Sequence, residues 1–158
     1  MRKKIITTNQ QETLSPDQDW LNLEAIAEVE MTSEDADYPI EGALISGQTS
    51  GWRAATPGKQ MIILLFPHPQ DIKRISLNFV ETRKERTQEY VLRYSSDGGK
   101  SSHEIVRQQW NFSPEGTTSE MEEHHVDLKT VSMLELIIIP DISGNEEVRA
   151  SLEKLQLA

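Results

Sequence analysis

An alternating stretch that runs directly into a glycine turn, residues 87–99, constrains the fold of this chain most. Tyr90, Leu92 and Tyr94 recur at every second position and fall on one face, with Glu89, Arg93 and Ser95 on the other. That period of two is typical of a β-strand that is buried on one face. The sequence Asp97-Gly98-Gly99 follows, and these residue types tolerate the positive φ angles of a hairpin turn. The stretch therefore predicts an antiparallel β-hairpin.

Further strand candidates are spaced along the chain as in an all-β sandwich. They cover residues 25–31, 60–66, 72–80, 104–110, 123–128, 133–139 and 147–157. Predicted turns separate them at Pro67-His68-Pro69, Ser113-Pro114-Glu115-Gly116 and Ser143-Gly144-Asn145. The pattern predicts one antiparallel sandwich of about eight strands. We expect its core to include Leu64, Ile75, Leu77, Phe79, Leu92, Leu136 and Ile138.

The N-terminal part differs from the rest in composition. Residues 1–13 are polar and without periodicity, so we expect a disordered tail followed by a single domain over residues 14–158. Ser15-Pro16-Asp17-Gln18 has the residue types that begin a helix, which predicts a short helical turn near residues 15–23. Its role is to lay Trp20 across one end of the sandwich.

Charge and composition exclude several classes of function. The net charge of −10 argues against nucleic acid as a partner, because binding to phosphates depends on Lys and Arg. No apolar run approaches the roughly 20 residues of a membrane-spanning helix. The basic N-terminus is followed by an apolar run of only Ile5 and Ile6, too short for a signal peptide, so we expect a cytoplasmic protein without membrane contact. The chain has no cysteine, which excludes disulfides and thiolate metal sites.

Four motifs in order resemble discoidin, or coagulation-factor C-type, domains and related bacterial carbohydrate-binding modules. They are an opening strand at residues 27–34, a loop ending on a tryptophan at residues 42–52, the hairpin at residues 90–98 and the closing strand at residues 150–155. The resemblance covers roughly residues 20–158. It implies a jelly-roll-like, galactose-binding-like sandwich whose ligand site lies in loops at one end.

This resemblance also implies a structural calcium ion, and the sequence departs from it there. The family holds the ion with a loop aspartate, a closing-strand glutamate and backbone carbonyls, but these two positions are Ser46 and Lys154. Calcium prefers several charged oxygens, and a lysine repels it. Glu153 or Glu41 are the acids that would have to substitute. We expect no metal.

Residues 122–127 concentrate other side chains that bind metals. His124 and His125 point to opposite faces of a strand, however, so they cannot both bind one ion without help. The chain carries no recognisable Ser/His/Asp arrangement and no paired carboxylates that we can assign to one cleft. We therefore expect no cofactor and no enzymatic activity.

Candidate ligand-binding residues have the chemistry of sugar recognition, which combines an aromatic face with planar polar groups. They are Trp52, Arg53, Arg83, Arg86, Trp110 and Asn111. The alternative interpretation is purely structural: the tryptophans close the core, and the arginines pair with Glu81 and Glu85. The leading hypothesis is a non-catalytic carbohydrate-binding module. The alternative is a cytoplasmic protein–protein interaction domain that holds a protein partner with the same loops.

Overall fold

The computed structural model describes residues 20–145 and 147–158, and the predicted tail lies outside them, as does most of the predicted helical turn. Helices are short: α2 (Leu23–Ile26) and α3 (Glu41–Leu44). The eight strands of the described residues agree with the predicted number. They are β1 (Glu28–Met31), β2 (Trp52–Arg53), β3 (Gln60–Val80), β4 (Arg86–Ser95), β5 (His103–Phe112), β6 (Ser119–Ile139), β7 (Ser151–Leu152) and β8 (Lys154–Leu157).

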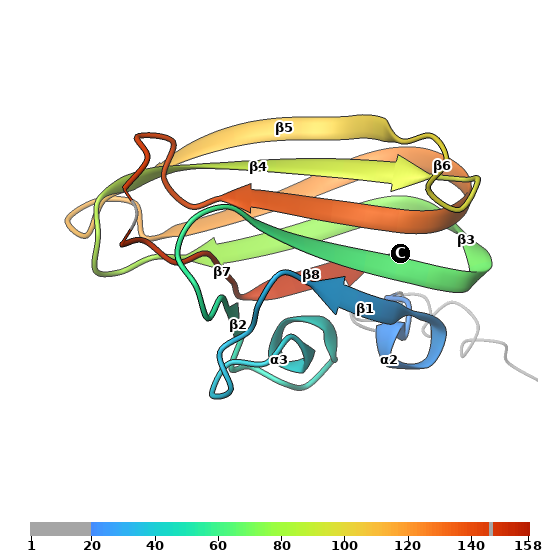
Figure 1. Ribbon diagram of the computed structural model, residues 1–158, viewed down its shortest axis with the longest axis horizontal. Coiled ribbons are helices and arrows are strands. Elements are labelled where there is room, and N and C mark those ends of the chain that lie inside the picture. Colours follow the sequence, from blue (N-terminus) through green and yellow to red (C-terminus); the bar gives the residue numbers. More distant parts are fainter. Residues whose placement is uncertain (1–19, 146) are drawn as a thin grey trace, which may run out of the picture.

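The strands form an antiparallel sandwich, as predicted (Figure 1). The first half of β3 and the second half of β6 lie in one layer with β1, β4 and β5. The second half of β3 and the first half of β6 pair with each other and, through β3, with β8 in the other layer. Phe79 and Tyr90 contact each other across the layers, with ring centroids 5.2 Å apart.

The sandwich folds from long strands that bend, which corrects one prediction. We predicted a turn at Pro67-His68-Pro69 between two strands, but β3 is continuous from Gln60 to Val80. Its pairing with β6 shifts register between Leu65 and Gln70, around the two prolines. Because proline has no N–H for the ladder, it is tolerated at such an irregularity. Residues 123–128 and 133–139 are likewise parts of the single strand β6.

Side chains that alternate inward from both layers fill the core. All seven predicted core residues are buried, with Leu77, Leu92 and Ile138 completely inaccessible. The predicted turn after β4 is confirmed, because Gly98 and Gly99 have φ angles of 75° and 95°. The Asp97 carboxylate stabilises this turn by accepting hydrogen bonds from Ser101 N and Ser95 Oγ.

Several connections meet at one end of the sandwich, at the left in Figure 1. They are the β3–β4, β5–β6 and β6–β7 connections. The ribbon of β2 and β7 lies beside this end. None of the helices in the described part of the chain has the length and apolarity needed to cross a bilayer.

Candidate functional site

A pocket of about 550 Å³ opens at this loop end. It is formed by the loop before α3, the β2–β7 ribbon, the β3–β4 loop and the segment that precedes β7. The residues that line it are Tyr38, Ser50, Trp52, Arg53, Val80, Glu81, Thr82, Arg83, Lys84, Glu147, Val148, Arg149, Ser151 and Glu153. The pocket is therefore lined by residues that are far apart in the sequence and lie close together at the ends of paired strands.

Glu81 shapes the β3–β4 wall of the pocket. One of its carboxylate oxygens accepts a hydrogen bond from Arg83 N at 3.1 Å, and the other accepts one from Arg86 Nε at 2.8 Å. Burial alone would raise the pKa of Glu81, but these hydrogen bonds and the Arg86 charge outweigh burial and hold that pKa below its usual range. Glu81 is therefore ionised and committed to the loop.

The opposite wall is built on β2. Arg53 N donates to the Tyr38 carbonyl at 3.1 Å, and the Arg53 guanidinium lies over the Tyr38 ring, 4.5 Å from its centroid. Trp52 lies behind this pair with only 1% of its surface exposed, and its Nε1 donates to the Ser33 carbonyl. Arg53 is thus oriented by a cation–π contact, and the indole of Trp52 supports the wall from inside.

Besides Arg53, the pocket lining carries the cations Arg83, Lys84 and Arg149. All three are exposed, and within the described ranges their side chains make no hydrogen bond or ion pair. They come from two loops, since Arg83 and Lys84 follow β3 and Arg149 precedes β7. An unpaired guanidinium beside a cavity retains its donors for an acceptor from solution.

Three of the six predicted ligand-binding residues, Trp52, Arg53 and Arg83, line this pocket. Arg86 does not, because it is only 4% exposed. Its Nη1 donates to the Pro140 carbonyl at 2.7 Å and to Gln88 Oε1 at 3.2 Å, and the guanidinium lies over the ring of Phe112. Arg86 therefore fastens the β3–β4 loop to the end of β6 from inside the sandwich.

The other two predicted residues lie near Arg86 at the end of β5. Trp110 pairs with Gln88, is half-buried against the core, and has an indole N–H without a partner among the described residues. Asn111 is exposed, and its side chain is hydrogen-bonded to that of Thr87 across the strand pair. These contacts hold β5 on β4, outside the pocket.

Lys154 lies at one of the two positions where the discoidin resemblance implies an acidic calcium ligand. Lys154 Nζ donates to two backbone carbonyls of the loop after α3, at 2.6 Å to Gln48 and 3.3 Å to Ile45. This loop packs closely on α3, since a Cβ at Gly42 would lie 2.6 Å from the Gly51 carbonyl oxygen. The ammonium already satisfies carbonyl oxygens that a cation would need, so these residues do not fit calcium.

A further polar cluster lies inside the sandwich. Tyr90 Oη and His124 Nε2 are 2.7 Å apart, and burial lowers the pKa of His124. Glu120 is 1% exposed, and neither of its carboxylate oxygens has a hydrogen-bond partner in the described part of the chain. Burial, together with the neighbouring charge of Glu122, raises the pKa of Glu120 to about 7. No group of three His, Asp or Glu residues in the described ranges is arranged to hold a metal ion.

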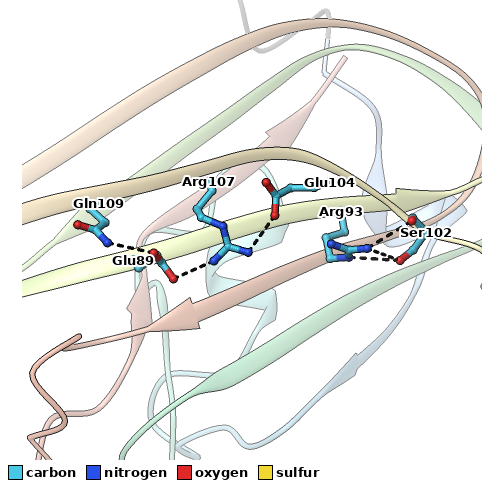
Figure 2. Close-up of polar contacts among 6 residues, drawn as sticks. All are labelled: Glu89, Arg93, Ser102, Glu104, Arg107 and Gln109. Carbon is cyan, nitrogen blue, oxygen red and sulfur yellow. Dashed lines mark hydrogen bonds and ion pairs between the residues drawn. The ribbon is translucent and has the colours of Figure 1, made fainter.

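The outer face of β4 and β5 carries cations of another kind (Figure 2). Arg107 is paired with Glu89 at 3.0 Å and with Glu104 at 2.9 Å, and Arg93 donates to Ser102 Oγ. Gln109 also donates to Glu89. These polar groups satisfy one another along the exposed sheet, unlike the cations of the pocket.

Several residues of the pocket were not predicted from the sequence to bind a ligand, notably Tyr38, Lys84, Arg149 and Glu153. Lys84 directly follows Arg83, which was a candidate ligand-binding residue, so its position was a usable signal. Tyr38 and Arg149 reach the pocket only through the pairing of β2 with β7, which brings residues about a hundred positions apart together. No local pattern carries that information.

No protein-family model matches the sequence, and no curated protein matches it either. Solved structures match in fold. A family 32 carbohydrate-binding module from Clostridium perfringens, in complex with galactose, has a TM-score of 0.63 at 14% identity, over 87% of this chain and 96% of that chain. The chain has the galactose-binding-like fold.

Two other modules extend this comparison. One from Clostridium perfringens, in complex with GalNAc-β-1,3-galactose, has a TM-score of 0.61 at 18% identity, over 88% of this chain and 99% of that chain. The other, in complex with 4,5-unsaturated mannuronic acid, has a TM-score of 0.60 at 16% identity, over 84% and 95% of the two chains. The resemblance found in the sequence is thereby confirmed for the fold.

Proposed function

We propose that this protein is a non-catalytic carbohydrate-binding module whose ligand binds in the loop-end pocket. The observation that carries the proposal is the set of unpaired donors around that pocket, Arg83, Lys84 and Arg149, beside the acceptors Glu147 and Glu153. A sugar presents hydroxyls that both donate and accept, so it needs both kinds of group. The modules of similar fold that were solved with sugars support this class of ligand.

The cavity itself suits a small ligand. Its 550 Å³ lies in the range typical of small-molecule sites, and it is an open pocket bordered by loops whose backbones are fixed by β2, β7 and the Glu81 contacts. The sequences of loops on a rigid sandwich can vary while the sandwich keeps the positions of the loops defined. Because the loop backbones are already fixed, binding a sugar has to order mainly the exposed side chains.

A glycan array followed by titration calorimetry tests the proposal. We expect binding to at least one glycan, and we expect the variant Arg83→Met/Arg149→Met to lose that binding. Both residues are exposed, so the double variant should keep the thermal midpoint of the parent protein. Arg107→Met is the matched control, because it removes an arginine from the outer sheet face and leaves the pocket intact.

Two results would contradict this function. Retained affinity in the double variant would exclude the pocket as the site. Capture of a specific protein partner from the host, without binding to any glycan, would favour the alternative, a protein–protein interaction domain. A cytoplasmic location and the lack of enzymatic activity stay predictions.

A further inference from the structure

The charge of the loop-end pocket is opposite to that of the whole protein. The chain has a net charge of −10, yet the described lining residues include four cations, Arg53, Arg83, Lys84 and Arg149. Three carboxylates line the pocket as well, and one of them, Glu81, is neutralised by Arg86 from below. The groups left for a ligand are therefore predominantly positive.

The aromatic surface in the pocket is small. Trp52 is 1% exposed, so its ring offers no open face. Tyr38 is half-buried, and the Arg53 guanidinium already lies over its ring. Neutral sugars are held largely by stacking on aromatic faces together with hydrogen bonds to hydroxyls. A pocket with so little free aromatic surface must obtain its affinity from its charged donors.

Guanidinium groups match carboxylates closely, because both are planar and can form two parallel N–H···O bonds. Among the described guanidinium groups of the pocket, Arg53 lies over the Tyr38 ring, whereas Arg83 and Arg149 make no side-chain contact of this kind, and they belong to different loops that both face the cavity. Lys84 adds a third unpaired positive charge beside Arg83. The remaining acceptors, Glu147 and Glu153, suit the hydroxyls of a sugar ring.

We infer that the pocket selects carbohydrates that carry a carboxylate, the uronic acids and other sugar acids, with Arg83 and Arg149 as the groups that bind the carboxylate. This inference rests on the proposed function, because it names the ligand class of the same site. Arg53, held on Tyr38, and Glu153 contact the ring hydroxyls. Neutral sugars of the same stereochemistry bind more weakly, since the carboxylate contacts are missing.

Matched pairs of ligands test the inference by titration calorimetry. The panel contains oligogalacturonate, oligomannuronate and sialyllactose, each with its neutral methyl ester. We expect at least one acid to bind at least about tenfold more tightly than its neutral partner, as hydrogen bonds to a charged group imply. The affinity for that acid should fall with added salt.

Variants then identify the groups responsible. Arg83→Gln and Arg149→Gln should each remove most of the preference for the acid, and Arg149→Lys should retain part of it because the charge stays while the fork is lost. Arg107→Gln should leave the preference unchanged. Thermal midpoints near that of the parent protein would establish that each variant is folded.

The outcomes separate this inference from the proposed function. Equal affinity within every pair, or a neutral sugar as the tightest ligand, would overturn the inference and leave the carbohydrate function intact. A lack of binding to every glycan on the array and in the panel would overturn both. Equal binding to polyglutamate would mean a general anion site, and that result would also overturn the inference.

Discussion

Two sets of cations in this molecule have opposite roles. Arg86 and Lys154 are satisfied by protein groups: Arg86 by Glu81, Gln88 and the Pro140 carbonyl, and Lys154 by two carbonyls of one loop. Arg83 and Arg149, by contrast, make no such side-chain contact in the described ranges. The difference indicates which cations hold the loops in place and which remain for a ligand.

Glu81 links one cation of each set, Arg86 and Arg83. Its carboxylate accepts from the Arg86 guanidinium on one side and from the Arg83 backbone on the other. The buried arginine therefore sets the position of the loop that presents the exposed arginine. Fixing the backbone in this way leaves the Arg83 side chain free and restricts where its donors can reach.

The first prediction breaks the buried side of the comparison and has the largest expected effect. Arg86→Met should lower the free energy of unfolding by about 3–5 kcal/mol, because it leaves a partly buried Glu81 charge and the Pro140 carbonyl without their donor. Arg83→Met, at an exposed position, should change it by less than about 0.5 kcal/mol. Urea denaturation of both variants measures the difference, and equal effects would contradict the division of roles.

A second prediction compares two glutamates, since Glu81 has a cationic partner and Glu120 has none in the described chain. The pKa of Glu120 is raised from 4.5 to about 7, so between these pH values the folded state binds more protons than the unfolded state. Stability should therefore fall as pH rises through that window, by on the order of 3 kcal/mol.

The variant Glu120→Gln isolates this effect. His124, whose pKa is lowered by burial, works in the opposite direction at pH values below about 6.5, and it is present in both proteins. In urea titrations we expect Glu120→Gln to exceed the parent protein in stability most at pH 8, and least at pH 4. A difference that does not change with pH would mean that Glu120 is already ionised without cost.

The third prediction concerns the ammonium of Lys154. Lys154→Met should lower the free energy of unfolding by about 1–2 kcal/mol, because two loop carbonyls lose a charged donor at a half-buried position.

A chelator should leave the thermal midpoint of the parent protein unchanged. The variant Ser46→Asp/Lys154→Glu restores the acids that the discoidin resemblance implies, and its midpoint should rise with added calcium.

A chelator-induced fall in the midpoint of the parent protein would contradict this account of Lys154. It would mean that nearby acids bind a metal ion beside the lysine. Glu153 and Glu41 are the acids to replace in that event.

The fold was predictable because alternation and turn residues are local signals. The alternation of Tyr90 and Leu92 predicted a strand face that is buried in the structure, and Asp97-Gly98-Gly99 predicted the turn that follows. Continued back from Tyr90, the same alternation reaches Gln88 and Arg86, and both are buried with Tyr90 in the structure, although this extension was not made from the sequence. Its charge led the sequence analysis to expect it at a ligand site instead.

The pocket was only partly predictable, for a physical reason. Arg53 and Arg83 were identified from residue type and loop position, but Tyr38 and Arg149 join them only after β2 and β7 have paired. The bend of β3 at Pro67 and Pro69 was likewise misjudged as a turn. Proline signals an interruption of pairing, and whether the chain then reverses or continues depends on its partner strand.

The last prediction concerns Arg107, which is exposed like Arg83 and Arg149 but paired with protein groups like Arg86 and Lys154. Arg107 contacts Glu89 and Glu104 on the outer face of β4 and β5 (Figure 2), and its side chain is 50% exposed. Exposed ion pairs contribute little, so Arg107→Gln should lower the thermal midpoint by no more than about 3 °C. That loss should shrink in high salt, which screens the pair in the parent protein. A larger, salt-independent loss would mean that the exposure of an arginine does not indicate whether it stabilises this fold. The assignment of Arg83 and Arg149 to a ligand would then rest on the binding data alone.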